Sequence, residues 1–159
     1  MIISGTGHRL NKLGGYDKIT FERLVELARI SLKELKPDKT ISGMALGWDQ
    51  ALTQASVDEK IPFVAAVPFK GQESIWPKES QGYYKSLLSE ASEVKIVSDG
   101  GYSNKKMQIR NEWMVNNSDL VLALWNGTSG GTDNCIKYAE KKDKPIKNVW
   151  NKWLEMRSM

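Results

Sequence analysis

The 159-residue sequence has very little cysteine and histidine, with one residue of each, Cys135 and His8. A single cysteine excludes a framework of disulfides within the chain and suits a reducing compartment. One cysteine and one histidine are too few for a zinc site without carboxylate ligands, so we predict no metal site and no bound cofactor. Cys135 could be a reactive thiol, but a small buried apolar side chain is the favoured interpretation. His8 could donate to a phosphate or act as an acid or base, and a structural role in capping its loop is equally supported.

Long apolar runs are also missing. No segment reaches the roughly 18 apolar residues that a membrane-spanning helix needs. Residues 1–10 lack the basic region followed by an apolar stretch that marks a secretory signal. We therefore expect a cytoplasmic protein with no membrane partner. The formal net charge of +4 favours an anionic ligand, but it is too small for a dedicated DNA-binding protein, so nucleic acid is not the expected partner.

Short apolar runs alternate with helical patterns along the chain. Apolar residues recur at three- and four-residue intervals from Phe21 to Leu35, which predicts a helix that Asp17 begins and Pro37 ends. Further strands are expected at 2–3, 40–42, 63–67, 94–97 and 120–124, and further helices at 49–57, 82–91, 104–117 and from 131, with an irregular stretch at 68–81. This alternation predicts an α/β fold in which a mainly parallel sheet of about five to six strands is covered on both faces. We expect 1–159 to form a single domain with a C-terminal tail from about residue 150.

Glycine-rich segments follow three of the expected strands, at 4–9, 42–47 and 127–132. In an open parallel sheet, ligands bind beyond the carboxyl ends of the strands, where loops lead into helix N-termini. Glycine lets the backbone approach a phosphate closely, and the helix N-terminus supplies unpaired N–H groups. One such segment alone would indicate a tight turn, but three in one small domain predict an anion-binding cleft. None forms a Walker motif or a complete G-x-G-x-x-G fingerprint, which disfavours a P-loop enzyme or an ordinary NAD-linked dehydrogenase.

The helix expected at 104–117 places Met107, Arg110 and Asn111 on one face. Burying an arginine and an asparagine without partners would be unfavourable. Either this face opens onto a polar pocket, which we favour, or Arg110 forms an internal ion pair with Asp49 or Asp119.

Tryptophan is frequent for a chain of this size, with six residues. Trp48, Trp76 and Trp125 lie in or near expected strand-end loops, where a ring could stack on a nucleobase. Plain packing is the alternative for each of them. Trp150 and Trp153 lie outside the expected sheet, and they belong either to a homo-oligomer interface or to a last helix that covers the core.

Longer motifs extend these segments, at 6–9 (TGHR), 12–16 (KLGGY), 41–50 (ISGMALGWDQ), 68–72 (PFKGQ), 107–114 (MQIRNEWM) and 122–132 (LALWNGTSGGT). In this order, and over nearly the whole chain up to residue 139, they resemble the YpsA-like branch of the SLOG superfamily. That superfamily is named for the DNA-processing protein SMF/DprA and the LONELY GUY enzymes. The resemblance implies a Rossmann-like three-layer sandwich and a nucleotide or nucleotide-derived ligand, including NAD-derived signals.

The LONELY GUY branch, which cleaves a base from a nucleoside monophosphate, implies catalytic roles. Its M-x-x-R-K-x-x-M helix is similar to 107–114, and its catalytic arginine matches Arg110. Its glycine motif ends in a glutamate, which is missing here after the segment 130–132. Because a carboxylate is the natural stabiliser of a cation-like sugar, this departure argues against hydrolysis. Asp49 and Asp133 are the candidate substitutes, and with Arg110 they are the candidate catalytic residues.

We therefore expect a protein that binds a phosphorylated nucleotide or nucleotide-derived small molecule, such as an NAD/ADP-ribose-type signal, as a sensor or sequestering protein. The alternative is an N-glycosidase of the phosphoribohydrolase type acting on nucleoside monophosphates or NAD-like substrates. Single-stranded DNA binding, by analogy with the DNA-processing relatives, is the third hypothesis. The expected ligand-binding residues are Gly5, Thr6, Gly7, His8, Arg9, Ser42, Gly43, Met44, Ala45, Gly47, Trp48, Asp49, Pro68, Phe69, Gln72, Trp76, Arg110, Asn111, Trp125, Asn126, Gly127, Ser129, Gly130, Gly131 and Thr132.

Overall fold

The computed structural model describes residues 1–158 and contains a six-stranded sheet in which all neighbouring strands are parallel, in the order β4-β3-β2-β1-β5-β6. The strands are β1 (Ile2–Gly7), β2 (Lys39–Ser42), β3 (Phe63–Val67), β4 (Glu93–Ile96), β5 (Leu120–Leu124) and β6 (Ile146–Asn148). The helices are α1 (Lys18–Leu35), α2 (Trp48–Asp58), α3 (Lys78–Ser89), α4 (Asn104–Asn116), α5 (Gly131–Lys141) and α6 (Trp150–Arg157), with 3-10 turns η1 (Leu10–Lys12) and η2 (Gln72–Ile75). The predicted Rossmann-like α/β fold is confirmed.

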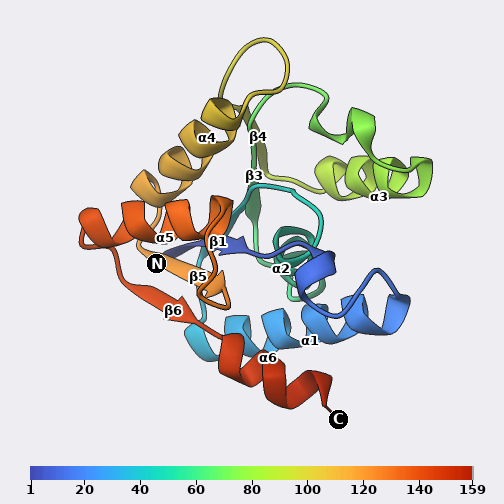
Figure 1. Cartoon of the computed structure of the whole chain (residues 1–159), viewed down its shortest axis with the longest axis vertical. Helices are drawn as coiled ribbons and strands as arrows, with labels where there is room; N and C mark the ends of the chain where they lie inside the picture. Colours follow the sequence, from blue (N-terminus) through green and yellow to red (C-terminus); the bar gives the residue numbers. More distant parts are fainter. Residues whose placement is uncertain (159) are drawn as a thin grey trace.

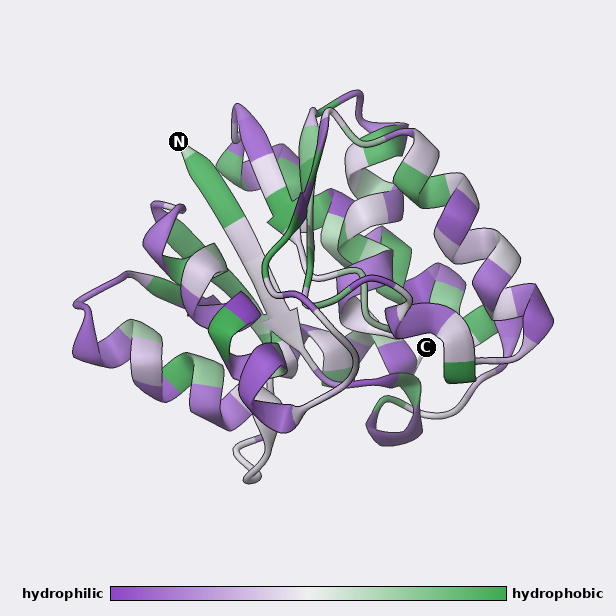
Figure 2. Cartoon of the chain, turned by 90° about the horizontal axis from the view of Figure 1, so that it is seen from above, coloured by the Kyte–Doolittle hydropathy of each residue, from purple (hydrophilic) through white to green (hydrophobic). Residues whose placement is uncertain are grey.

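Helices cover both faces of the sheet, as the predicted three-layer sandwich requires (Figure 1). On one face, Ile3 of β1 packs in a cluster with α1, α2 and α6, and Phe63 of β3 packs in a second cluster with α3. On the other face, Val64 packs with Met114 of α4, and Val121 packs with α5. Because successive side chains of a strand point to opposite faces, each inner strand contributes to both layers. Figure 2 shows the matching pattern, with hydrophobic and hydrophilic residues alternating along the helices.

β1 differs from the other strands in its position in the strand order. The chain runs from β1 outward to β2, β3 and β4 on one side, and β5 and β6 follow on the other side. The order of the strands therefore reverses at β1, between β2 and β5. In open parallel sheets, the crevice at the carboxyl ends of such strands is where ligands bind.

β1 extends further than the sequence indicated. The expected strand stops at Ile3, with a loop after it, but the observed strand continues to Gly7 because Gly5 and Gly7 pair with Leu122 and Leu124 of β5. A Cβ atom on Gly7 would lie 2.5 Å from the Trp48 side chain. The glycines of this segment are thus required by the close packing of α2 on β1.

The chain after residue 149 also differs from the expected tail. It forms α6, and Trp153 is completely buried in the cluster that α1 and α2 share with the sheet. Of the two interpretations of the tryptophan pair, Trp153 therefore covers the core. α3 begins at Lys78, four residues before the expected start, since Pro77 has a φ of −56° that suits a helix start. No helix in the described residues is long and apolar enough to span a membrane.

Candidate functional site

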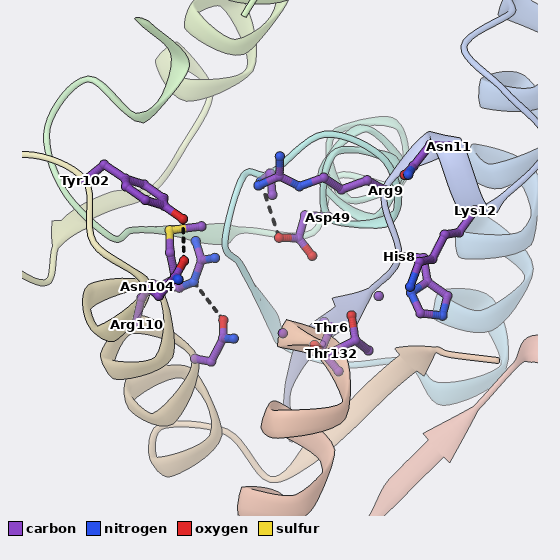
Figure 3. A pocket seen from close by; sticks show the side chains of 16 residues that line it. Thr6, His8, Arg9, Asn11, Lys12, Asp49, Tyr102, Asn104, Arg110 and Thr132 are labelled. Atoms are coloured by element: carbon purple, nitrogen blue, oxygen red, sulfur yellow. Dashed lines mark hydrogen bonds between the residues drawn. The ribbon is translucent and has the colours of Figure 1, made fainter. Parts of the chain in front are cut away.

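A cavity of about 380 Å³ opens at the carboxyl end of β1. One part of its wall comes from the end of β1, from η1, and from the start of α2 with the loop before it. The other part comes from α4 with the loop before it and from the N-terminus of α5 (Figure 3). These elements are far apart in the sequence and meet where the strand order reverses.

Residues from all three glycine-rich segments take part in the lining. The expected site residues that line the cavity are Gly5, Thr6, Gly7, His8, Arg9, Ala45, Asp49, Arg110, Asn111, Gly131 and Thr132. The expected residues outside its lining are Ser42, Gly43, Met44, Gly47, Trp48, Pro68, Phe69, Gln72, Trp76, Trp125, Asn126, Gly127, Ser129, Gly130 and Asp133.

Several expected residues outside the lining pack in the core or form hydrogen bonds in the loops around the cavity. Trp48 is fully buried, and its Nε1–H donates to the Leu122 carbonyl at 3.3 Å. Trp76 packs edge-on against Tyr84, with ring centroids 5.4 Å apart. The indole N–H of Trp125 donates to the Thr128 carbonyl at 2.8 Å. The tryptophans that were candidates for stacking on a base are therefore held in packing or in loop contacts.

Arg110 is a buried side chain of the cavity wall that donates three hydrogen bonds to the protein. It is only 4% exposed, and its Nη1 donates to the carbonyls of Gly43 at 2.6 Å and Ala66 at 3.3 Å. Its Nε donates to Oδ1 of Asn111 at 2.9 Å. Among residues 1–158 it forms no direct ion pair with an aspartate, so of the two sequence alternatives the pocket position is the one observed.

Asp49 lies at the N-terminus of α2, and its carboxyl group and the guanidinium of Arg110 both lie next to Gly43. One of its carboxylate oxygens accepts from the Ala45 N–H at 3.3 Å. Burial raises the pKa of the Asp49 carboxyl above its ordinary value, while the positive charge of Arg110 opposes this shift. The guanidinium of Arg110 stays protonated in proteins, so it is the nearby positive charge that favours the ionised form of Asp49.

His8 is held by the segment that follows β5. Its Nε2 lies 3.0 Å from the backbone nitrogen of Asn126 and 2.8 Å from Oδ1 of the same residue. Nε2 therefore faces one donor and one acceptor of Asn126, so a ring protonated at Nε2 donates to the side-chain oxygen and a ring protonated at Nδ1 accepts from the backbone N–H. Burial is the main cause that lowers the pKa of His8, with Lys12 acting in the same direction and Asn126 opposing. His8 thus has the expected structural role of fixing a loop, and it also lines the cavity.

The N-terminus of α5 forms another wall. Gly130 occupies the N-cap position without a side-chain cap, and Gly131 and Thr132 line the cavity. Within the described part of the chain, the backbone N–H groups of these two residues have no hydrogen-bond acceptor. Asp133 points elsewhere and forms an ion pair with Lys137 at 3.0 Å.

The cavity also has lining residues that were not among the expected ones: Asn11, Lys12, Tyr102, Asn104 and Met107. Lys12 follows the first glycine-rich segment, and its Nζ donates to Thr128 of the third at 3.2 Å. Asn104 precedes Asn111 by seven residues, so one more turn of the same helical face would have identified it. Tyr102 gave no signal in the sequence, because its loop reaches the cavity only through the position of α4.

The charge of the lining is positive. Arg9, Lys12 and Arg110 face a single carboxylate, Asp49, among the described lining residues. In residues 1–158, no group of three histidine, cysteine, aspartate or glutamate side chains is placed to hold a metal ion.

Comparison with known proteins places the chain in a family. Residues 31–157 match the YspA SLOG family. The uncharacterized SPbeta prophage-derived protein YoqJ of Bacillus subtilis (strain 168) is 33% identical, in an alignment that covers 78% of this chain and 81% of YoqJ.

Solved structures share the fold at low sequence identity. DNA processing protein A from Helicobacter pylori, described for its single-stranded DNA binding mode, has a TM-score of 0.67 at 18% identity over 98% of this chain and 72% of that chain. The molybdenum cofactor carrier protein from Chlamydomonas reinhardtii has a TM-score of 0.56 at 13% identity over 91% of this chain and 73% of that chain. The family match, the relative and the common fold agree with the resemblance found in the sequence, and the chain belongs to the YspA SLOG family.

Proposed function

We propose that this protein binds a phosphorylated nucleotide or nucleotide-derived small molecule in the cavity at the end of β1, as a sensor or sequestering protein. The observation that carries the proposal is the charge of the wall, where Arg9, Lys12 and Arg110 outnumber Asp49. A phosphate or pyrophosphate would neutralise this excess and accept hydrogen bonds from the cations. The cavity volume of about 380 Å³ is that of a small-molecule site.

The phosphate end of the ligand is expected at the N-terminus of α5. The free N–H groups of Gly131 and Thr132 and the partial positive charge of the helix end favour an anion there. A Cβ on Gly131 would meet no atom within 4 Å, so a ligand has room to approach the backbone. Lys12 and His8 stand on the adjoining wall (Figure 3).

Calorimetry on the intact chain with ribose 5-phosphate, AMP, NAD and ADP-ribose tests this proposal. We expect Arg9→Ala and Lys12→Ala each to weaken binding about 10- to 100-fold, because each removes a charge-assisted hydrogen bond. Lys85→Ala, which changes an exposed lysine on α3, is the matched control and should bind like the wild type. If none of these ligands binds at millimolar concentration, the proposal is wrong.

An N-glycosidase is the second candidate, and the position of Asp49 in the cavity wall is the observation that favours it. Asp133 lies outside the lining and pairs with Lys137, so Asp49 would have to stabilise the cation-like sugar alone. Chromatography of nucleoside monophosphates and NAD after incubation would detect the released base. Release by the wild type that is lost in Asp49→Asn would replace the binding proposal with the enzymatic one.

Single-stranded DNA is the third candidate, since the Helicobacter pylori protein of the same fold is described as binding it. Binding of this kind would weaken steeply as the salt concentration rises. A gel-shift assay at low salt, with a nucleotide as competitor, separates this candidate from the small-molecule proposal. A shift that excess nucleotide does not reverse would indicate a separate nucleic-acid surface.

A further inference from the structure

One side of the cavity is built differently from the phosphate side. Figure 3 shows Tyr102 and Asn104 across the cavity from His8 and Lys12. Asn104, Met107 and Asn111 all line the cavity from α4. This α4 face carries two side-chain amides and a thioether, and the guanidinium of Arg110 on the same helix donates to the Gly43 and Ala66 carbonyls.

The amide of Asn111 has a fixed orientation. Its Oδ1 accepts from Nε of Arg110 at 2.9 Å, and a guanidinium can only donate. The oxygen must therefore face the arginine. The Nδ2 group, with its two N–H donors, is left without an acceptor among residues 1–158 and belongs to a cavity-lining side chain.

The amide of Asn104 is oriented in the same sense. Its Oδ1 accepts from the hydroxyl of Tyr102. The Nδ2 group of Asn104, like that of Asn111, has no acceptor in the described part of the chain. Both amides thus present N–H donors that have no acceptor among residues 1–158, whereas each oxygen already accepts one hydrogen bond. A ligand group that presents acceptors complements this side of the cavity best, since an N–H facing another N–H is a lost hydrogen bond.

Tyr102 supplies an aromatic surface beside these donors. The residue is 67% exposed, and it touches Phe69 edge-to-face at 6.0 Å between ring centroids. An edge-to-face contact uses at most one face of a ring, so at least one face of Tyr102 is available for stacking. Met107 adds a polarizable sulfur to the same lining, which also packs well on flat rings.

We propose that this side of the cavity holds the base of the nucleotide, and that it selects bases whose edge carries an oxo group in place of an amino group. The favoured class is the 6-oxopurine and 4-oxopyrimidine nucleotides, whose exocyclic oxo group accepts from the amides of Asn104 and Asn111 while Tyr102 stacks on the ring. The inference rests on the proposed function, because the phosphate end determines which way the ligand lies in the cavity.

The test compares pairs of ligands that differ in this single group. Calorimetry of the intact chain with IMP and AMP, and with UMP and CMP, should give about tenfold tighter binding of the oxo member of each pair. Equal affinities within both pairs, or a preference for AMP and CMP, would overturn the inference. Ribose 5-phosphate is the third probe. If it binds and the bases add no selectivity, only the base inference fails, whereas failure of every probe removes the proposed function itself.

Two substitutions make the test specific to the named groups. Asn111→Asp keeps an acceptor for Arg110 and turns the donor group into a second acceptor, so the preference within each pair should fall to unity or reverse. Asn151→Asp, an exposed position on α6, introduces the same charge elsewhere and should keep the wild-type preference. An unchanged preference in Asn111→Asp, with the fold intact by circular dichroism, would contradict the inference.

Two substitutions of Tyr102 test the contributions of its hydroxyl and of its ring separately. Tyr102→Phe releases the Asn104 amide and should reduce the preference for oxo bases, with little effect on the binding of ribose 5-phosphate. Tyr102→Leu removes the stacking surface and should weaken binding of all four nucleotides about tenfold. If Tyr102→Leu bound nucleotides like the wild type, the base would lie elsewhere.

Discussion

The guanidinium of Arg110 and the carboxylate of Asp49 both lie against the same side of Gly43, which has no side chain to hold them apart. A Cβ atom on Gly43 would be 2.6 Å from Nη1 of Arg110 and 2.9 Å from Oδ2 of Asp49. Both side chains are more than nine-tenths buried, at 4% and 8% exposure. The second glycine-rich segment therefore leaves space for a buried guanidinium and a buried carboxyl group in the cavity wall.

Gly43→Ala should destabilise the protein, because the added methyl group would push both charges from their positions. We expect a loss of about 1–3 kcal/mol in the free energy of unfolding, measured by urea denaturation. Gly82→Ala is the control, since a Cβ there meets nothing within 4 Å and the residue lies in α3. That control should be neutral or slightly stabilising. Equal stability of the two variants would argue against the tight packing at Gly43.

Arg110→Ala should be more damaging to stability than removal of any exposed arginine. It leaves the Gly43 and Ala66 carbonyls without this donor and the Asp49 carboxylate without its electrostatic partner. We expect a loss of about 3–5 kcal/mol in the free energy of unfolding, because two buried carbonyls lose a charged donor and a buried carboxyl group loses the positive charge near it. The comparison variant Arg29→Ala, whose partners are the exposed Glu26 on α1 and the part-buried Glu59 just after α2, should lose only about 1 kcal/mol. Losses of equal size in the two variants would show that Arg110 is not a framework residue.

His8 should make stability fall below neutral pH. Burial lowers its pKa in the folded state from the ordinary value of 6.5, so the unfolded chain takes up the proton first. The stabilisation is complete above pH 6.5 and is lost as the pH falls through the lower pKa of the folded protein. Because the chain has one histidine, an NMR titration of its ring protons gives this pKa without assignment.

The same titration tests the phosphate position. Ribose 5-phosphate bound beside His8 should raise the pKa of the imidazole, since an anion favours its protonated form. His8→Gln should flatten the dependence of stability on pH between 6.5 and the folded pKa. A pKa of His8 above 6.5 in the free protein would contradict the burial described here.

Cys135 should be unreactive in the folded protein. It is 3% exposed in the cluster between α5 and the sheet, and burial raises its pKa to about 11. Little thiolate exists at pH 8, so Ellman's reagent should modify it slowly in buffer and rapidly in guanidinium chloride. Rapid modification without denaturant would mean that α5 opens readily from the sheet.

Much of the fold was predictable because its signals are local. The alternation of strands and helices and the helix that Pro37 ends both follow from periodicity and turn residues in short windows. The extent of β1 was not predictable in this way. Its glycines look like a loop, and only their pairing with β5 and the packing of Trp48 against them makes them a strand.

The residues of the candidate site also fall into two groups, those that local sequence signals identify and those whose position depends on tertiary packing. Thr6, Arg9 and Thr132 were identified because glycine-rich segments after parallel strands must reach the same edge of the sheet. Tyr102 and Asn104 were missed because their position depends on how α4 packs over β3 and β1. Trp48 and Trp76 were named because aromatic residues near strand ends can stack on ligands, but their packing in the core follows from helices that no local pattern places.

By itself, the sequence determined the class of fold and the sheet edge at which its glycine-rich segments meet. These properties depend on hydrophobic periodicity, on the direction of parallel strands and on composition, which short stretches of chain already contain. The tertiary structure alone decided that Arg110 and Asp49 share the space in front of Gly43, that β1 continues through its glycines, and which amide groups face the cavity. Each of these depends on distances between elements that are remote in the chain, and such distances are fixed only when the helices pack on the sheet.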